Sequence, residues 1–275
     1  MSRVWVVTGA SGGLGGAIAG EVLARGDRLV ALVRRPEAAA GLIGADPERV
    51  RTVEFEATQP MSVEAAGAEA IGAFGRVDVL VNNAGYALLG ALEELDGGAV
   101  RGNFEACFFA PMNLMRAVLP GMRERGSGHI INISAAAAII NYPGFGAYGA
   151  AKCALEGLSE AVAQEAGPLG VRVTIVQPGP FRTGFVSRSV VRAERTIAEY
   201  EGTSGKFGAL IRKLDGQQPG DPVKAAKAIV DLANAEKPPL RLALGKYAVN
   251  KVRKRLRETG AELEAWESVS SGADF

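Results

Sequence analysis

Cysteine and histidine are nearly absent from this chain of 275 residues, which contains only Cys107, Cys153 and the single histidine His129. Both cysteines stand in apolar sequence, which is typical of reduced packing thiols in a cytoplasmic protein and not of a disulfide framework. Because His129 has no histidine partner, the sequence argues against a metal centre and against a Ser-His-Asp triad. We therefore predict no metal site.

An excess of charge of one sign is also missing, since 31 basic and 30 acidic residues leave a formal net charge of +1. This balance gives no reason to expect binding to nucleic acid or to an anionic membrane surface. The chain begins Met1-Ser2-Arg3 and enters the apolar run 4–7 directly, so we expect no signal peptide. The expected partner is a small molecule, and the expected location is the cytoplasm.

A long uninterrupted hydrophobic run is lacking as well. The longest charge-free stretch, 129–151, has the length of a membrane span, but asparagines, glycines and Pro143 interrupt it. We interpret this stretch as a core strand followed by an active-site loop.

What the chain does contain is 48% apolar residues, enough for a large core, and we predict a single domain over 1–275. Short apolar runs alternate with longer amphipathic ones, which is typical of an α/β protein whose parallel sheet is covered by helices. The predicted strands are 3–8, 28–33, 50–55, 77–82, 129–134 and 171–177.

A glycine-rich loop joins the first predicted strand to a predicted helix from about Leu14 to Ala24. Gly9, Gly13 and Gly15 allow a tight turn that brings backbone amides and the positive helix end close to a pyrophosphate. Their spacing is Gly-x-x-x-Gly-x-Gly, which differs from the commoner Gly-x-Gly-x-x-Gly. A glycine turn of this kind also occurs for packing alone, so the assignment depends on the motifs that follow.

The second predicted strand ends in Arg34 and Arg35. A site that prefers NAD would carry an acidic residue here for the ribose hydroxyls, whereas two guanidiniums suit the 2′-phosphate of NADP. NADP (NADPH) is therefore favoured over NAD. Two exposed arginines at the start of a loop are the alternative, and Gly12 counts mildly against NADP because a cation at that position would add to the phosphate site.

Tyr148 and Lys152 stand four residues apart at the start of a predicted helix that Pro168 ends. This spacing places both side chains on one face, one turn apart. After Phe185 the periodicity weakens until Pro219, and the segment 185–219 is predicted to be either a lid over the substrate or a variable surface excursion. The C-terminal extension 246–275 is predicted to form a charged surface helix between Lys246 and Trp266.

With these motifs in order, the chain resembles the short-chain dehydrogenase/reductase family over nearly its whole length. The matching motifs are Thr8-Gly9-x-x-x-Gly13-x-Gly15, Asn82-Asn83-Ala84-Gly85, Asn103, Tyr148-x-x-x-Lys152 and Pro178-Gly179-Pro180-Phe181-Arg182-Thr183. The resemblance implies a Rossmann-type doubly wound sheet of about seven parallel strands, an NAD(P) cofactor and hydride transfer between the nicotinamide and a substrate carbon.

By this resemblance the catalytic residues are Tyr148, Lys152 and Asn103. Tyr148 would exchange the proton. Lys152, with the positive charge of oxidised nicotinamide, would favour its phenolate and would also bind the nicotinamide ribose. Asn103 would hold a water that connects Lys152 to solvent. An ordinary phenol, with a pKa of about 10, is a poor base near neutrality, which is why such a neighbour is required. The predicted cofactor-binding residues are Thr8, Gly9, Ser11, Gly12, Gly13, Leu14, Gly15, Arg34, Arg35, Glu56, Ala57, Asn83, Ala84, Gly85, Tyr148, Lys152, Pro178, Gly179, Phe181 and Thr183.

One family position departs from the pattern. Relatives carry a catalytic serine thirteen residues before the tyrosine, where this chain has Ala135. Ser134 precedes it, and a shift of one residue along an extended chain turns a side chain to the opposite face, so Ser134 is a poor substitute. Loss of one donor to a developing oxyanion costs about 10²- to 10³-fold in rate. Asn141, Tyr142 or a substrate group could replace the hydroxyl.

Three functions therefore stay open. The first is an NADP-dependent enzyme that acts on an alcohol or carbonyl with a substitute donor. The second transfers hydride at a carbon–nitrogen centre such as an imine, where no oxyanion develops. The third is a non-redox protein: a dinucleotide-binding sensor, an isomerase or a cyclase. Side chains expected at the substrate favour a fairly hydrophobic molecule: Tyr86, Leu88, Leu89, Phe145 and Phe185. The resemblance allows a homodimer or homotetramer.

Overall fold

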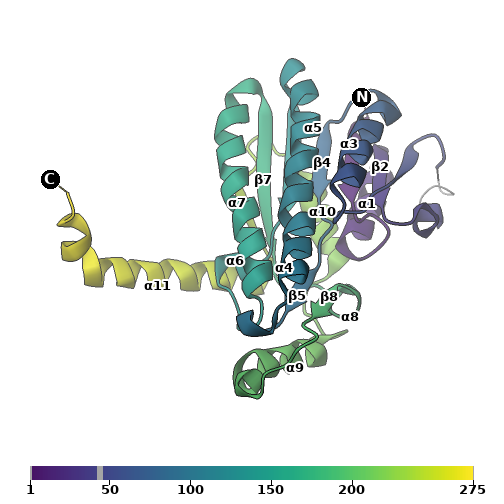
Figure 1. Ribbon diagram of the computed structural model, residues 1–275. Helices are drawn as coiled ribbons and strands as arrows, with labels where there is room; N and C mark the ends of the chain where they lie inside the picture. Colours follow the sequence, from purple (N-terminus) through teal and green to yellow (C-terminus); the bar gives the residue numbers. More distant parts are fainter. Residues whose placement is uncertain (1, 42–45, 275) are drawn as a thin grey trace.

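A single seven-stranded sheet forms the centre of the protein (Figure 1). The computed structural model describes residues 2–41 and 46–274; residues 1, 42–45 and 275, which the predicted domain 1–275 includes, lie outside the described residues. All neighbouring strands of this sheet are parallel, in the order β3-β2-β1-β4-β6-β7-β9. Its strands are β1 (Val4–Thr8), β2 (Arg28–Val33), β3 (Val50–Glu54), β4 (Val79–Asn82), β6 (Gly128–Ile133), β7 (Val171–Pro178) and β9 (Arg241–Leu244). The predicted Rossmann-type fold is confirmed.

The strand predictions hold to within two residues, but β9 was missed. Arg241–Leu244 is only four residues long, stands at the edge of the sheet and is half-exposed, so it lacks the continuous apolar run of a central strand. By contrast, β2 is buried from Leu29 to Val33 because helices cover both of its faces.

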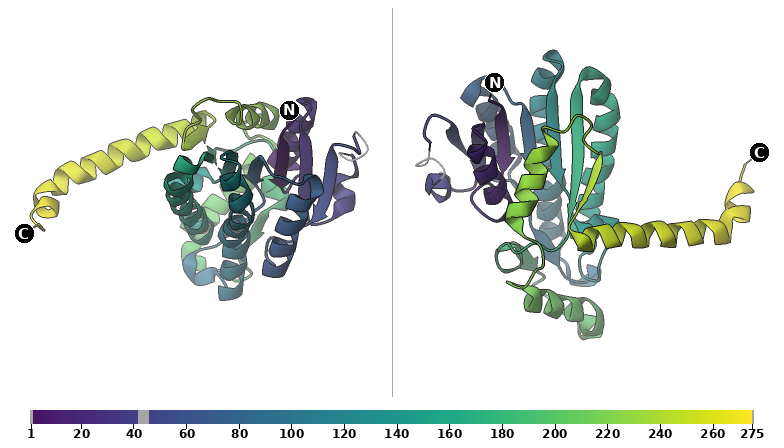
Figure 2. Two further views of the ribbon diagram at one scale, coloured as in Figure 1. Left: turned by 90° about the horizontal axis from the view of Figure 1, so that it is seen from above. Right: turned by 180° about the vertical axis from the view of Figure 1, so that it is seen from behind.

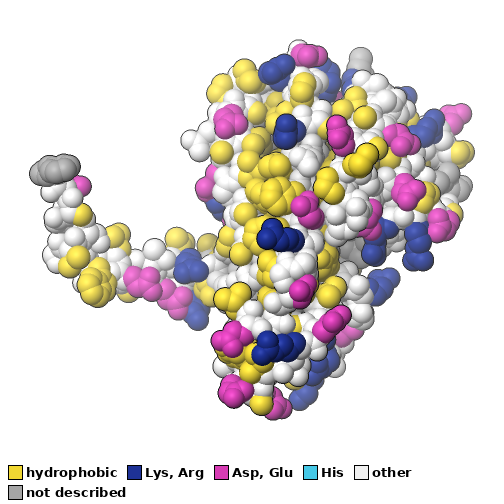
Figure 3. All heavy atoms as spheres, viewed as in Figure 1, with side chains coloured by type: hydrophobic (Ala, Val, Ile, Leu, Met, Phe, Trp, Pro, Cys, Tyr) yellow, Lys and Arg dark blue, Asp and Glu magenta, His cyan; other side chains and the backbone are white. Residues whose placement is uncertain are grey.

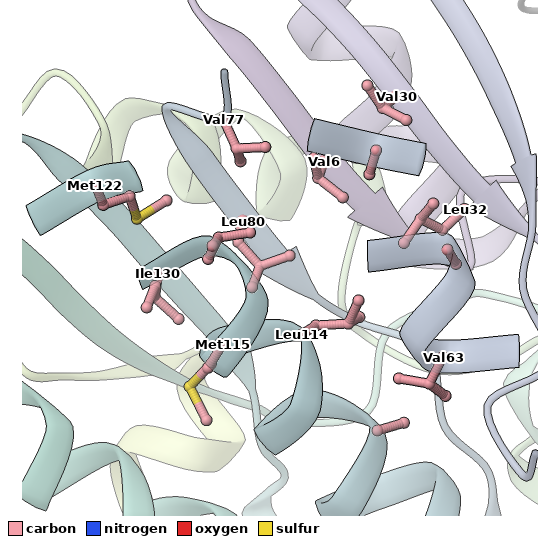
Figure 4. Packing of buried hydrophobic residues seen from close by; sticks show 14 of the residues in the cluster. Val6, Val30, Leu32, Val63, Val77, Leu80, Leu114, Met115, Met122 and Ile130 are labelled. Atoms are coloured by element: carbon pink, nitrogen blue, oxygen red, sulfur yellow. The ribbon is translucent and has the colours of Figure 1, made fainter. Parts of the chain in front are cut away.

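Two helical layers enclose the sheet (Figure 2). On one face lie α3 (Pro60–Phe74), α5 (Ala110–Glu124) and α7 (Gly146–Ala166), and on the other lie α1 (Gly13–Ala24) and α10 (Pro222–Leu232). Figure 4 shows the first of these cores, in which strand side chains meet the inner face of α5: Val6, Val30, Leu80 and Ile130 against Leu114, Met115 and Met122. Burial of this apolar surface is the main stabilising contribution to the fold.

Shorter elements gather at the ends of the strands and below the sheet. They are η1 (Pro36–Ala39), η2 (Leu92–Glu94), α4 (Gly97–Phe104), η3 (Glu105–Phe109), α6 (Ala136–Ile139), η4 (Gly167–Leu169), α8 (Phe185–Arg188), η5 (Ala198–Tyr200), η6 (Glu201–Gly205) and α9 (Lys206–Leu214). A second, two-stranded sheet pairs β5 (Ala87–Leu89) with β8 (Val190–Arg192). The long helix α11 (Lys246–Ser271) ends five residues beyond the predicted Trp266.

The prediction that both cysteines are packing residues is correct for Cys107 only. Cys107 is buried and Cys153 is exposed, and both are free. Cys153 is therefore not a packing residue, because its position on α7 faces away from the sheet. Within residues 2–41 and 46–274, no helix combines the length and the apolar character needed to cross a membrane.

The single histidine makes folding sensitive to mild acid. His129 is 4% exposed on β6, and burial lowers its pKa from 6.5 to about 4. Its Nε2 donates to Thr174 Oγ1 at 3.0 Å, because that hydroxyl itself donates to Pro239 O. Above pH 6.5 the imidazole is neutral in both states; as the pH falls from 6.5 to about 4, only the unfolded chain binds the proton.

We expect the free energy of unfolding to fall by about 2 kcal/mol between pH 7 and pH 5 from this group alone, since one pKa unit corresponds to about 1.4 kcal/mol. His129→Gln keeps an N–H donor but does not titrate, so its urea-unfolding free energy should change less over the same interval. Equal pH dependence in both proteins would refute this assignment.

Candidate active site

The predicted site residues converge at the carboxyl ends of the central strands. The sheet order reverses between β1 and β4, since the chain proceeds from β1 outward through β2 and β3 and then returns to β4 on the other side. In open α/β sheets the crevice at such a switch point is where ligands bind. The loops after β1 and β4 therefore form the floor of the site.

The glycine loop after β1 has the geometry of a phosphate cradle. Gly9 and Gly13 adopt φ values of 68° and 58°, which favour glycine. A Cβ on Gly15 would overlap Gly9 O and Asn83 Nδ2, so only glycine allows α1 to approach the β4 loop this closely. Among the described residues, no atom lies within 4 Å of a Cβ added to Gly12, and no side chain caps the first turn of α1. The cradle thus presents uncapped helix amides to open space, as an anion site requires.

Thr8 ties this loop to the loop after β4. Its Oγ1 accepts hydrogen bonds from the amides of Asn83 and Ala84, both at 2.8 Å, and Asn83 Nδ2 donates to Thr8 O at 2.9 Å. These contacts fix the two loops at the switch point relative to each other.

Arg34 and Arg35 follow β2 directly and are both exposed on the same edge of the sheet. Glu56, the predicted partner of the adenine amino group, follows β3, and its Oε1 accepts from the amide and the hydroxyl of Thr58 at 3.1 and 2.9 Å. Ala57 packs against the core beside it. These residues all follow the carboxyl ends of β2 and β3.

Tyr148 and Lys152 occupy adjacent turns of α7, as predicted, and both are deeply buried, with exposures of 7% and 3%. Lys152 Nζ donates to Ile133 O at 2.8 Å, which anchors the ammonium at the carboxyl end of β6. Asn103 on α4 is fully buried; its Nδ2 donates to Tyr86 O at 2.8 Å, while its Oδ1 has no partner among the described residues. That unpaired oxygen fits a polar ligand at this site.

The predicted lowering of the Tyr148 pKa is not present in the protein alone. Burial raises the pKa of Tyr148, and the neighbouring Cys107 adds to this effect. In the protein alone, the ammonium of Lys152 does not offset the loss of water around the phenol. Tyr148 is therefore held as a neutral phenol, the form that donates a proton.

Ala135 lies in the same apolar cluster as Tyr148 and is 8% exposed. Ser134, one residue earlier, is turned away: its Oγ donates to Glu156 Oε1 at 2.5 Å in a buried network that also contains Gln177 and Arg241. The expectation that Ser134 faces away from the site is confirmed, and its hydroxyl instead stabilises the packing of α7 on β7.

Of the two side chains considered as substitute donors, Tyr142 is engaged elsewhere. Its hydroxyl shares a 2.8 Å hydrogen bond with the hydroxyl of Tyr247, its ring stacks on Phe207 at 4.8 Å, and Lys251 Nζ lies 3.4 Å from the ring centroid. Asn141 is exposed, and its Oδ1 accepts from the amide of Tyr142 at 2.9 Å.

Apolar side chains pack around the Tyr148 side chain. Phe145 packs edge-on against Tyr148 with ring centroids 5.4 Å apart, and Phe185 lies at 6.4 Å. The predicted Leu88 does not belong to this cluster, because neighbours on β5 point to opposite faces and Ala87 and Leu89 face Tyr148 instead. Residues that sequence reasoning missed here are Phe104, Cys107, Val186, Val190, Phe207 and Ile211.

Phe207 and Ile211 stand four residues apart on α9, so helical spacing inside the weakly patterned segment 185–219 was the one signal that could have found them. Phe104 directly precedes η3 and Cys107 lies within it, and no local motif marks either residue. The segment itself is attached to 87–95: Ala193 N donates to Leu89 O at 2.8 Å, and Tyr200 Oη donates to Glu93 Oε1 at 2.9 Å.

The loop after β7 lies across from the glycine loop. Thr183 is the nearest side chain to Gly13, 3.7 Å from the position of an added Cβ, and Gly179 N donates to Leu244 O at 3.0 Å. Pro178 ends β7, and Phe181 forms an isolated bridge with Gly220. A cavity of about 530 Å³ opens here between Gly13 and Thr183. A larger cavity of about 820 Å³ lies at the opposite, amino-terminal edge of the sheet beside Arg3 and Gly128, away from Tyr148.

The sequence profile of short chain dehydrogenases matches residues 3–194, from β1 to just beyond β8. The chain belongs to the short-chain dehydrogenase family. This short-chain dehydrogenase is 36% identical over 272 residues to "Oxidoreductase BOA17" of Botryotinia fuckeliana (strain B05.10), with 98% of each chain covered. It is 34% identical over 249 residues, 88% of each chain, to a 3-ketodihydrosphingosine reductase of Bacteroides thetaiotaomicron.

Solved structures agree with this assignment. A short-chain dehydrogenase from Streptomyces avermitilis superposes with a TM-score of 0.93 at 44% identity, covering 99% of this chain and 98% of that one. A metagenomic short-chain oxidoreductase in complex with NADP gives a TM-score of 0.70 at 28% identity over 89% and 97% of the two chains. The protein with this sequence is therefore an oxidoreductase.

Proposed function

We propose that this short-chain dehydrogenase is an NADP(H)-dependent reductase of a carbonyl group in a fairly hydrophobic small molecule. The observation that carries the proposal is Tyr148: a neutral phenol, 7% exposed, one turn from Lys152 and enclosed by apolar side chains. A phenol at this place can donate its proton to a substrate oxygen that gains charge during reduction, and it takes the proton back in the reverse reaction.

The residues present fit a nicotinamide dinucleotide. The open space at Gly12 and the uncapped first turn of α1 suit the pyrophosphate, and the unpaired Oδ1 of Asn103 suits the polar environment near the nicotinamide ribose. Arg34 and Arg35 would hold the 2′-phosphate, and Thr183 would face the nicotinamide. When bound, the cofactor supplies the hydride.

The protein's own groups then divide the remaining tasks. Tyr148 would protonate the substrate oxygen, and Lys152, fixed by its bond to Ile133 O, would position the phenol and the cofactor. The segment 185–219 would cover the substrate, since Phe185, Phe207 and Ile211 already line the cluster around Tyr148. This enclosure excludes water and strengthens the interactions inside the site.

The substrate class follows from this lining. Aromatic and aliphatic side chains leave Tyr148 as the main polar group that faces the cluster, so apolar burial supplies most of the binding free energy. The 34% identity to a 3-ketodihydrosphingosine reductase supports a ketone attached to an apolar chain.

A second candidate, reduction at a carbon–nitrogen double bond, is favoured by Ala135. No hydroxyl replaces the family serine there, Ser134 is bonded to Glu156, and the hydroxyl of Tyr142 is shared with Tyr247. An iminium carbon needs no oxyanion donor, whereas a ketone loses about 10² to 10³ in rate without one.

Ala135→Ser distinguishes the two candidates. NADPH oxidation is followed at 340 nm with wild type and the variant against long-chain ketones, aldehydes and cyclic imines. If the enzyme reduces carbonyls with a substitute donor, wild type should already be active on ketones and serine should change kcat/KM less than tenfold. If it is specialised for imines, serine should raise ketone reduction by about two orders of magnitude and leave imine reduction unchanged or lower.

Ala136→Ser is a suitable control, because this residue is equally small, 6% exposed and adjacent in sequence, but it lies outside the apolar cluster around Tyr148. It should lack the gain on ketones. Failure of wild type and variant to oxidise NADPH with any substrate would contradict the proposed function.

Cofactor choice has its own test. Arg34→Asp should weaken NADPH binding about ten- to hundredfold and leave NADH binding within a factor of three, because charge-assisted hydrogen bonds to the 2′-phosphate contribute about 1.5–3 kcal/mol. Fluorescence titration gives both dissociation constants. Arg101→Asp, an exposed arginine on α4, should alter neither of them. Equal weakening of NADPH and NADH by Arg34→Asp would refute the 2′-phosphate site.

A further inference from the structure

Helix α11 leaves the body of the protein. Figures 1 and 2 show it extending sideways from the sheet as a rod that bends near its far end, where the C-terminus lies. Only its first turns contact the body: Ala248 is buried, Lys251 Nζ donates to Ala136 O at 3.4 Å and Arg255 Nε donates to Ile139 O at 2.8 Å. Beyond Arg255 its residues are exposed, apart from the half-buried Gly260.

An apolar stripe runs along this rod at heptad spacing. Steps of three and four residues alternate along the positions Val249, Val252, Leu256, Thr259, Leu263 and Trp266. Leu256, Leu263 and Trp266 are 69%, 62% and 64% exposed, and apolar side chains show between the charged ones on the rod in Figure 3. A stripe with this period is the contact surface of paired helices, and a helix that only faces solvent has no need of it.

The part of α11 that does not contact the body, residues 256–271, needs a packing partner to be stable as a helix. Sixteen residues, 256–271, extend beyond the last contact with the body, and they include Gly260, Thr259 and three serines, which lower helix propensity. An isolated helix of about 12–15 residues is marginal in water even when it is rich in alanine. A partner along the stripe would supply the missing stabilisation.

Charge along the helix identifies that partner. The half that begins at the body is basic, and the far half is acidic. The basic residues are Lys246, Lys251, Arg253, Lys254, Arg255 and Arg257, and the acidic residues are Glu258, Glu262, Glu264 and Glu267. A second copy of α11 in the antiparallel orientation sets each basic half against an acidic half, whereas the parallel orientation sets like charges together.

We propose that α11 is a dimerisation arm that forms an antiparallel two-helix coiled coil with α11 of a second copy of this chain. The heptad positions match in one register, which pairs Val249 with Trp266, Val252 with Leu263 and Leu256 with Thr259 of the second copy. Two-fold symmetry repeats each layer. The same register brings Lys246 to Glu267 and Arg255 to Glu262 at the flanks and makes no like-charged pair there. The active sites stay at opposite ends of a helix pair about 39 Å long.

Sedimentation equilibrium of the full chain tests the arm. Leu263→Glu/Trp266→Glu places charges in the core of the pair, and at about 10 µM it should reduce the particle mass to half that of wild type. Met61→Glu introduces the same charge at an apolar side chain that is 85% exposed on α3, and it should keep the wild-type mass. A monomeric wild type, or a double variant with the wild-type mass, would overturn the proposal.

Disulfide cross-linking tests the orientation, in a Cys153→Ser background because Cys153 is exposed. Val252→Cys/Leu263→Cys should form covalent dimers on oxidation, and each single variant should not, since residues 252 of the two copies lie about eleven residues apart in the antiparallel pair. Cross-linking by the single variants would show a parallel pair and overturn the proposal. Co-sedimentation of a monomeric wild type with anionic lipid vesicles would also overturn it, because the stripe would then serve a membrane surface.

Discussion

Tyr148→Phe is expected to lower kcat/KM for the carbonyl substrate by about 10²- to 10⁴-fold, the usual contribution of a positioned proton donor. The variant removes one buried hydroxyl and keeps the ring that packs against Phe145 and Phe185, so the fold and the affinity for NADPH should change little. Initial rates at 340 nm and a fluorescence titration of NADPH measure the two quantities separately.

Tyr200→Phe is the matched control for this change. Tyr200 lies in the segment 185–219, and the variant removes its exposed phenolic hydroxyl, which donates to Glu93. The variant's rate should stay within about threefold of wild type. Retention of more than a tenth of the wild-type rate by Tyr148→Phe would show that another group protonates the substrate.

Gly15→Ala is expected to abolish dinucleotide binding at cofactor concentrations that saturate wild type. The new Cβ would overlap Gly9 O and Asn83 Nδ2 and would lie 2.9 Å from Gly9 C, so α1 must move away from the loop whose amides we propose to bind the pyrophosphate. Overpacking of this kind typically costs about 1–3 kcal/mol of stability, and the displaced amides add a loss of affinity. Thermal unfolding with and without NADPH should show a lower midpoint and no shift upon cofactor addition.

Gly20→Ala, five positions further along α1, provides the comparison. Gly20 is exposed and lies outside the cradle, and an added Cβ there has no described atom within 4 Å. This variant should keep the stabilisation by NADPH to within a few degrees of wild type. If Gly15→Ala also keeps it, the close approach of α1 to the Asn83 loop is not what forms the phosphate cradle.

The order of elements could be predicted because each central strand is buried on both faces. That environment requires a continuous apolar run, such as Leu29 to Val33, and the run is visible in the sequence. Edge strand β9 escaped prediction since its residues are half-exposed and its pairing with β7 is a tertiary contact. The weakly patterned segment 185–219 proved to contain α8, β8 and α9, and its hydrogen bonds to residues 87–95 hold it in place.

The spacing of the proposed catalytic pair was equally visible, because Tyr148 and Lys152 are neighbours on one helix. Their electrostatic environment was not. Whether the Tyr148 phenol is charged depends on burial by residues 40 or more positions away in sequence, such as Cys107, and on Lys152 bonding to Ile133 O. Desolvation depends on everything that packs around a group, and it has no local signal.

The sequence by itself determined the family, the parallel α/β sheet, the glycine cradle and the identity of the residue at position 135, since each follows from local pattern or from a single position. Only the tertiary structure decided that Ser134 turns to Glu156, that the hydroxyl of Tyr142 is taken by Tyr247, and that α11 stands free with its stripe exposed. The first two features arise from contacts between residues that are 22 and 105 positions apart in sequence, and the third from the absence of such contacts along most of α11. Only the folded chain establishes them.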